Sequence, residues 1–244
     1  MQRASFEIRP FSALVGAAVA VMALALAGMQ QGPSVERSLE LKLPGTPITS
    51  LPFTVDECGS YFLTDCLTGV SGQHGITIQA DDVTLDLNGF TLTGVPGSLG
   101  GVTAVGPLEN VSVQNGTVRG WGGTGLDLQS SNASRADGVR SFGNGGSGIT
   151  IGDGGLVTGC STFNNGLDGI LAGIGCLVVD CVAAGNLATG VNGGQNAMVH
   201  TCVTTLNGLD GIAVFDGHVA ESTSKGNGGS DLNLAAGSTS SDSH

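Results

Sequence analysis

Short runs of alternating apolar and polar residues fill the chain from Ile76 onward. Between Ile76 and Leu92, apolar residues alternate with polar ones in three short runs: Ile76 and Ile78, then Val83, Leu85 and Leu87, then Phe90 and Leu92. This period of two predicts β-strands with one buried face, because successive side chains of a strand point to opposite sides. The runs are also too short and too rich in glycine and β-branched residues for helices of ten or more residues. The pattern therefore predicts an all-β chain.

One phrase returns along the second half of the chain at an almost fixed interval. NGLDGI occurs at Asn165–Ile170 and again, unchanged, at Asn207–Ile212. The apolar residues that lead successive runs are 20 to 24 residues apart: Val102, Leu126, Ile149, Ile170, Val191, Ile212 and Leu232. A fixed period of this size is typical of a solenoid, in which each repeat stacks on its neighbours. The spacing predicts a single-stranded parallel β-helix of about seven to eight coils over residues 76–234.

Stacking places equivalent residues above one another, about 4.8 Å apart, in columns along the solenoid. One column contains a single asparagine per coil: Asn144, Asn165, Asn186, Asn207 and Asn227. We expect these amides to form a structural ladder, in which each side chain hydrogen-bonds to the next coil. A second column, Cys160, Cys181 and Cys202, is predicted to point inward as small apolar filling, because parallel neighbours suit a disulfide poorly. Cys176 has no column partner, and its state stays open.

The first thirty residues have the pattern of a targeting segment. Arg3 and Arg9 flank the start of an uncharged apolar run from Phe11 to Ala27, which ends in the small residues of Ala25-Leu26-Ala27. This pattern predicts a signal peptide over residues 1–27, and thus a secreted or cell-surface protein. The alternative is a retained membrane anchor, since the run approaches the length of a membrane span.

Three further segments lie outside the predicted coils. Residues 28–51 are interpreted as a leader or linker, residues 52–75 as an N-terminal cap over the first coil edge, and residues 235–244 as a disordered polar tail. In an exported protein, Cys58 and Cys66 in the cap predict a disulfide; the alternative is two unpaired thiols. An uncovered edge at the last coil would also allow oligomerisation through that edge.

The repeats resemble a known family. The run ITIQADDVTLDLNGFTLTG at Ile76–Gly94, then VQNGTVRGWG at Val113–Gly122 and the NGxxGI coils are similar to bacterial exported proteins with right-handed parallel β-helix repeats, over roughly residues 52–234. The resemblance implies the pectin-lyase-like fold, including its right-handedness. Most such proteins are uncharacterised, and the better-known ones cleave or epimerise polysaccharides. The Gly-His-Gly and Arg-Ile-Lys elements of the family's hydrolases are absent from this sequence.

The charge restricts the partners that the chain can bind. Its formal net charge is −12, with only eight Lys and Arg residues. Nucleic acid and anionic membranes are excluded as partners, because phosphate binding needs a basic stripe. The same charge disfavours acidic polysaccharides, and the scarcity of bases disfavours the lyase chemistry that the resemblance implies. No motif indicates a cofactor or a metal.

The departures from the repeat supply the candidate site residues. Register predicts that Asp180, His200 and Glu221 lie on one face of three neighbouring coils, where an acid, an imidazole and an acid could carry out general acid–base catalysis. The alternative is that these three residues are scattered polar side chains of an exposed sheet, with no common role. Asp168 and Asp210 form a second pair, two coils apart, which Asp-Gly turn chemistry also explains.

The only tryptophan, Trp121, occupies the turn position of the asparagine column. It is a candidate for stacking on a sugar, or else it packs on a neighbouring glycine-rich turn. From these features we predict an exported, non-catalytic scaffold that contacts a polysaccharide or another cell-surface component. The alternative is a small carbohydrate-active enzyme, a polysaccharide lyase or hydrolase.

Overall fold

The computed structural model describes residues 45–243, and all of its regular elements are β-strands. The predicted signal segment and residues 28–44 of the predicted leader lie outside the described residues. No helix that could span a membrane occurs in the part of the chain that the structure describes.

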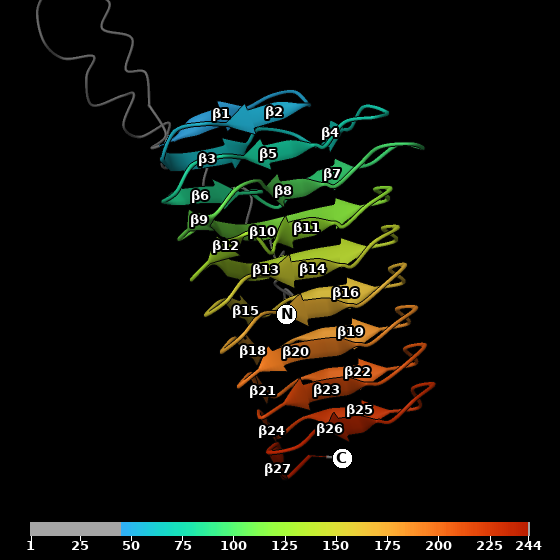
Figure 1. The fold of residues 1–244 in the computed structure, drawn as a ribbon. Coiled ribbons are helices and arrows are strands. Elements are labelled where there is room, and N and C mark those ends of the chain that lie inside the picture. The colour runs from blue at the N-terminus through green and yellow to red at the C-terminus, as the bar shows by residue number, and fades with distance from the viewer. Residues whose placement is uncertain (1–44, 244) are drawn as a thin grey trace, which may run out of the picture. The chain divides into compact units, whose positions relative to one another are not determined.

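The described chain winds into stacked coils, and each coil contributes one strand to a nine-stranded parallel sheet, here called the first face (Figure 1). The fold therefore has nine coils, one more than the upper end of the predicted range. The strands of the first face are β2 (Phe53–Val55), β5 (Ile76–Ile78), β8 (Val102–Ala104), β11 (Leu126–Leu128), β14 (Ile149–Ile151), β17 (Ile170–Ala172), β20 (Val191–Gln195), β23 (Ile212–Phe215) and β26 (Leu232–Leu234).

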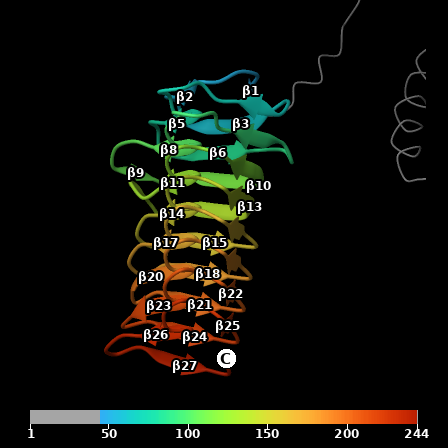
Figure 2. The same ribbon diagram turned by 90° about the vertical axis from the view of Figure 1, so that its right-hand side faces the viewer.

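A 16-stranded sheet bends around the rest of the solenoid and forms two further faces (Figure 2). The second face consists of β1 (Thr46–Ile48), β3 (Gly59–Leu63), β6 (Val83–Asp86), the first halves of β10 (Ser112–Arg119) and β13 (Arg135–Phe142), β15 (Leu156–Thr158), β18 (Leu177–Val179), β21 (Met198–His200), β24 (His218–Ala220) and β27 (Thr239–Ser241). The third face consists of β4 (Leu67–Thr68), β7 (Thr91–Thr93), the second halves of β10 and β13, β16 (Ser161–Phe163), β19 (Val182–Ala184), β22 (Val203–Thr205) and β25 (Thr223–Lys225). A small separate sheet pairs β9 (Leu108–Glu109) with β12 (Ser131–Asn132).

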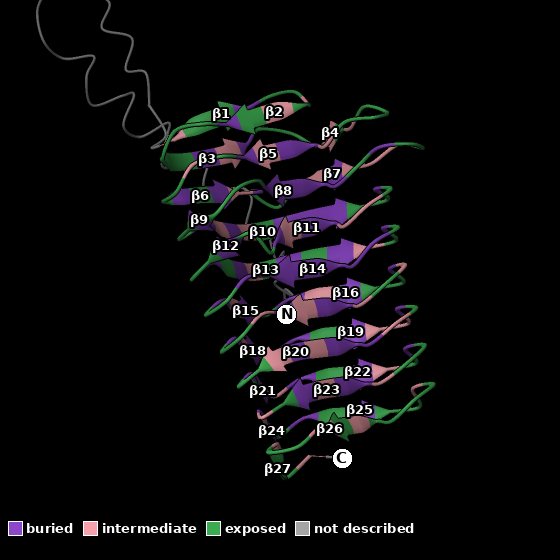
Figure 3. Ribbon diagram, in the orientation of Figure 1, coloured by how far each residue is buried: buried purple, intermediate pink, exposed green. Residues whose placement is uncertain are grey.

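The inward residues of each coil form the core, as the predicted alternation requires. Ile149, Ile170 and Val191 stack in one buried column of the first face, and the register of their strands has no offset. Figure 3 shows that buried segments of strand repeat from coil to coil. One residue of positive φ turns the chain between the second and third faces, such as Asn115 at 57° or Asp180 at 55°. From β10 onward, the second and third faces therefore meet at a single residue in each coil.

Three of the predicted segment assignments differ from the structure. The leader predicted over residues 28–51 contains β1, which pairs with β3 and is part of the second face. The predicted cap contains β2, whose Phe53 and Val55 pair in register with Ile76 and Ile78, so it forms a coil of the solenoid and not a separate cover. The segment predicted to be disordered contains β27, which pairs with β24. Its small polar residues suit an edge coil, because their hydroxyls reach the preceding coil; Ser238, for example, accepts a hydrogen bond from the Gly217 N–H at 3.2 Å.

The predicted asparagine ladder is confirmed. The side-chain Nδ2 and the backbone N–H of Asn144, Asn165, Asn186 and Asn207 each donate to the Oδ1 of the next asparagine, at 2.9–3.1 Å. At the upper end, the Trp121 N–H donates to Asn144. At the lower end, Asn227 donates to the Asp231 carboxylate, and these hydrogen bonds lower the pKa of Asp231. A charged acceptor therefore terminates the row of amides.

Trp121 shares the backbone position of this ladder, but its side chain does not face solvent. The indole is 1% exposed, and its Nε1 donates to the Leu92 carbonyl at 3.3 Å. A Cβ added at Gly69, Gly75 or Gly101 would lie 2.4–3.1 Å from the indole ring. The sugar-stacking prediction is therefore wrong, and the alternative of packing on glycine-rich turns is correct, because these glycines leave the ring a space inside the coil.

The cysteines divide into a buried set and an exposed pair. Cys160, Cys181 and Cys202 are free thiols that point inward, as predicted. Hydrogen bonds with the other two thiols, together with burial, raise the pKa of the Cys181 thiol, which stays protonated at neutral pH. Cys176 is also buried and free, and burial raises the pKa of its thiol.

The predicted Cys58–Cys66 disulfide is not formed, since both residues are free and exposed. The five residues of β3, Gly59–Leu63, lie between them. At about 3.3 Å per residue, this extended strand alone separates its flanks by more than the roughly 7 Å limit for the Cα atoms of a disulfide.

Candidate functional site

The outer side of the first face is hollowed at several places along its length. The outward residue at the centre of its strands is mostly small and polar: Thr54, Thr77, Thr103, Asp127, Thr150, Leu171, Asn192, Ala213 and Asn233. Three hollows of about 320, 220 and 160 Å³ open along this sheet. The first face therefore presents a lengthwise row of polar recesses.

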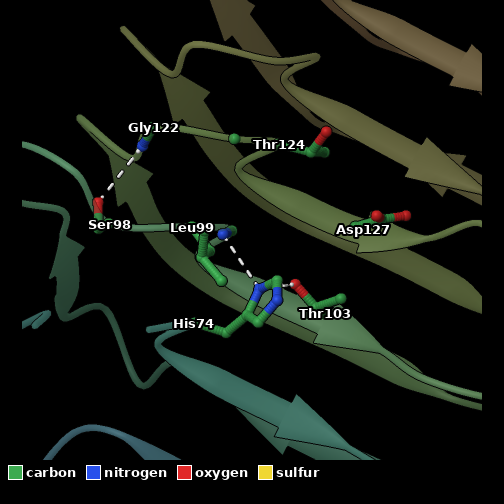
Figure 4. Close-up of a pocket in the computed structure, with 9 residues that line it drawn as sticks. His74, Ser98, Leu99, Thr103, Gly122, Thr124 and Asp127 are labelled. Atoms are coloured by element: carbon green, nitrogen blue, oxygen red, sulfur yellow. Dashed lines mark hydrogen bonds between the residues drawn. The ribbon is translucent and has the colours of Figure 1, made fainter. Parts of the chain in front are cut away.

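The largest of the three hollows lies at the third and fourth strands of this sheet, β8 and β11, and at the turn before β5 (Figure 4). His74 lines it from that turn, Thr103 from β8 and Asp127 from β11. The His74 Nδ1 accepts a hydrogen bond from the Gly100 N–H at 3.1 Å and lies 3.0 Å from the Thr103 hydroxyl. Because Nδ1 is an acceptor here, the neutral ring has its proton on Nε2.

The carboxylate of Asp127 is held from the adjacent coil. Its Oδ1 accepts hydrogen bonds from the Thr150 hydroxyl at 2.6 Å and from the Gln129 N–H at 3.2 Å. These two contacts fix the side chain in the hollow. With the Thr103 hydroxyl beside it, the hollow offers hydrogen-bonding groups of the kind that a sugar hydroxyl needs.

His74 also takes part in a structural arrangement that recurs twice further along the sheet. His74, Asp168 and Asp210 all lie two residues before the first residue of a first-face strand. The Asp168 carboxylate accepts from the Thr189 N–H, and Asp210 from the Ser230 N–H, both one coil ahead. The side chains of Asn192 and Asn233, three residues further on, donate to the same two carboxylates. These bonds support turn chemistry for Asp168 and Asp210 and give no support to an acid–base pair.

The predicted trio of Asp180, His200 and Glu221 does come together, at the corner between the second and third faces. The His200 Nε2 lies 3.8 Å from a Glu221 carboxylate oxygen. The residue directly in register between the two acids is Thr201, whose hydroxyl donates to Asp180 and lies 3.2 Å from the His200 Nδ1. The corner thus contains a continuous chain of polar groups, although His200 is offset by one residue from the acid column.

These contacts fix the neutral His200 ring in the opposite tautomer to His74. Because the Thr201 proton is directed at Asp180, its oxygen accepts from Nδ1–H, and the lone pair of His200 is on Nε2 beside Glu221. Thr201 also has a φ of 50°, which is unfavourable for a β-branched residue. Asp180 and Glu221 are exposed, and His200 is half-buried between them.

No cluster of three or more metal-ligating His, Cys, Asp or Glu side chains occurs among residues 45–243. His74, Thr103 and Asp127 were not predicted as site residues, because the coils there are 26 and 24 residues long and fall outside the 21-residue period. The usable signal is position within the coil, since His74 precedes its strand by the same two residues as Asp168 and Asp210.

No family model and no curated protein matches this sequence. Solved structures share its fold. The periplasmic alginate epimerase AlgG is 14% identical with a TM-score of 0.60, over 75% of this chain and 49% of that one. The A-module of the Azotobacter vinelandii mannuronan C-5 epimerase AlgE6 is 16% identical with a TM-score of 0.61, over 82% and 69%. Pectate lyase Pel9A is 13% identical with a TM-score of 0.52, over 83% and 67%.

At these identities the likeness shows the fold alone, and the chain spans about half the length of AlgG. The chain is a right-handed parallel β-helix, the fold of these solved structures. The family resemblance of the repeats is thereby confirmed at the level of fold.

Proposed function

We propose that this protein is an exported, non-catalytic β-helix scaffold that binds neutral polysaccharide along the outer side of the first face. The observation that carries the proposal is the row of three hollows on one sheet, lined by hydroxyl, amide and carboxylate groups. Polysaccharide as the ligand is supported by the solved neighbours, two of which are named for alginate or pectate. The export step rests on the predicted signal segment over residues 1–27.

The charge of the first face favours a neutral glycan. Arg119, Arg135, Arg140 and Lys225 are the basic residues of the described chain, and all four lie on strands of the other two faces. Asp127, by contrast, lines the largest first-face hollow. A uronate would meet a carboxylate there with no cation to compensate, whereas a neutral sugar hydroxyl can donate to it.

The hollow of about 160 Å³ at the C-terminal end of the first face combines amide groups with an aromatic ring, as sugar-binding sites do. Asn192 and Asn233 line it with amides, and Phe215, which is 48% exposed, supplies an aromatic ring. A phenyl face packs against the apolar C–H face of a pyranose ring, while the amides hydrogen-bond to its hydroxyls. This end of the first face is where we expect the strongest contact with a sugar.

Phe215→Ala is therefore expected to weaken binding of a neutral glycan by about fivefold, the loss of one stacking contact. Isothermal titration of the mature protein with dextran, amylose and soluble β-glucan oligosaccharides measures this. Leu187→Ala, which removes an exposed apolar side chain from the turn between β19 and β20, away from the first-face hollows, is the control and should leave these affinities unchanged. Absence of binding to every neutral glycan, or equal loss in both variants, would refute the proposal.

The corner of Asp180, His200 and Glu221 favours a second candidate, a small carbohydrate-active enzyme, because the His200 ring lies between two acids, with its Nε2 3.8 Å from Glu221 and Thr201 linking its Nδ1 to Asp180. If this candidate is right, the mature protein turns over a polysaccharide and His200→Ala lowers the rate by at least about 100-fold. A reducing-end assay on neutral and uronic polysaccharides measures this. Turnover that persists in the variant would exclude the corner as the catalytic centre.

A further inference from the structure

The third face has a surface chemistry unlike the rest of this acidic protein. Its outward positions, read along β7, β10, β13, β16, β19, β22 and β25, contain no Asp or Glu. Three of the four basic residues of the described chain are on it, namely Arg119, Arg140 and Lys225. Among residues 45–243, the strands of the third face therefore have no acidic side chain on their outer side and three basic ones.

Arg119 and Arg140 have no ion-pairing partner among the described residues. The one Arg–carboxylate pair of that part of the chain joins Arg135 to Asp137 at 2.7 Å, on the second face. Both unpaired arginines are exposed, and the corner acids Asp180 and Glu221 belong to coils further along the solenoid. Two guanidinium groups are thus available to an anion, each with N–H donors suited to a carboxylate or sulfate.

Aromatic rings continue the same column. Arg119 pairs in register with Phe142, and Phe142 pairs with Phe163, so a cation and two rings follow one another at the coil spacing of about 4.8 Å. Thr93, Arg119 and Phe142 line a hollow of about 240 Å³ together with Gly120 and Gly143. Phe163 is 52% exposed.

The arginines and phenylalanines of the third face together indicate the kind of ligand that it would bind. The guanidinium groups bind an anionic substituent, and the phenyl faces pack against apolar C–H groups of a sugar ring. A polysaccharide also fits the column of Arg119, Phe142 and Phe163, because a chain of sugar rings can contact successive residues along the solenoid. A second copy of this chain suits it poorly, because an isologous dimer through this face would bring the arginines of both copies together.

We propose that the third face is a second binding site, for an anionic polysaccharide, in which Arg119 and Arg140 hold carboxylate or sulfate groups and Phe142 and Phe163 support the sugar rings. The site is separate from the neutral-glycan surface on the first face and does not rest on it. The net charge of −12 disfavours acidic polysaccharides for the chain as a whole, but local charge governs an exposed site within a Debye length, about 8–10 Å at physiological salt.

The test is titration of the mature protein with polygalacturonate, dextran sulfate and neutral dextran at low and at physiological salt. We expect binding of at least one anionic polymer that weakens with salt, and a loss of about tenfold in Arg119→Gln. The two anionic polymers distinguish a carboxylate from a sulfate ligand. Arg135→Gln, which removes an arginine already paired with Asp137, is the matched control and should retain wild-type affinity.

Three results would overturn this proposal: no binding of either anionic polymer, equal losses in Arg119→Gln and Arg135→Gln, or equal binding of poly-glutamate, which would indicate an acidic peptide ligand. Sedimentation of the free protein adds a fourth, since a dimer that Phe163→Ala dissociates would make this face a self-association surface. Binding of neutral dextran is expected to be the same in all arginine variants, so failure here leaves the first-face site to be judged separately.

Discussion

Asn186→Ala is expected to lower the free energy of unfolding by about 3 kcal/mol. Asn186 lies in the middle of the ladder and is 1% exposed. Its Oδ1 accepts from the backbone N–H and Nδ2 of Asn165, and its Nδ2 donates to Asn207. Alanine removes these side-chain bonds and leaves the buried donors of Asn165 without an acceptor in a place that water does not reach. The unsatisfied donors, more than the lost bonds, make the substitution severe.

Equilibrium urea unfolding, followed by circular dichroism, measures the effect as a lower midpoint. Asn192→Ala is the matched control, because Asn192 is half-buried on the outer side of the first face and donates a single bond to Asp168 at 3.3 Å. We expect its cost to stay below about 1 kcal/mol. Equal midpoints for the two variants would show that the ladder does not stabilise the coils more than an ordinary surface amide does.

The repeat made the fold predictable where its period is constant. From Asn144 to Asn227 the coils are 20 or 21 residues long, so columns, inward residues and the ladder follow from counting. Earlier coils are 23 to 26 residues long, and the one that begins at Phe53 contains no NG phrase, so a period search places it in a cap. The last strand, β27, consists of Thr and Ser and has no apolar alternation that would predict a strand. Its pairing with β24 depends on the coil beneath it and not on its own apolar pattern.

The candidate sites were less predictable, because they depend on side-chain direction and on local charge. Counting placed His200 near Asp180, but the residue that joins them is Thr201, which only the register of the corner reveals. Net charge likewise disfavoured acidic ligands, and it could not show that the acids avoid the third face. Composition averages over the surface, whereas a solenoid separates residues of the same period onto three different faces.

Trp121 is the position where a sequence period and a side chain disagree most. The backbone follows the ladder, since the Trp121 N–H donates to Asn144. The ring instead fills the interior beside the glycines at 69, 75 and 101; a Cβ at Gly69 or Gly75 would overlap it, and one at Gly101 would lie in tight contact at 3.1 Å. Those glycines belong to other coils, so the sequence around residue 121 does not indicate that the interior has room for the indole. The indole thus ties three consecutive coils of the N-terminal half together.

Trp121→Ala is therefore expected to destabilise the protein by about 4 kcal/mol, through lost burial and the cavity left among glycines that cannot fill it. Trp121→Phe keeps most of the ring and loses the bond to the Leu92 carbonyl, so its expected cost is about 1–2 kcal/mol. Urea unfolding of both variants measures the difference. Because the chain has a single tryptophan, the emission spectrum of the wild type is an independent measurement: a blue-shifted maximum is expected for a ring that is 1% exposed. Emission at the wavelength of a solvated indole, together with a neutral Trp121→Ala, would mean that the ring faces solvent after all.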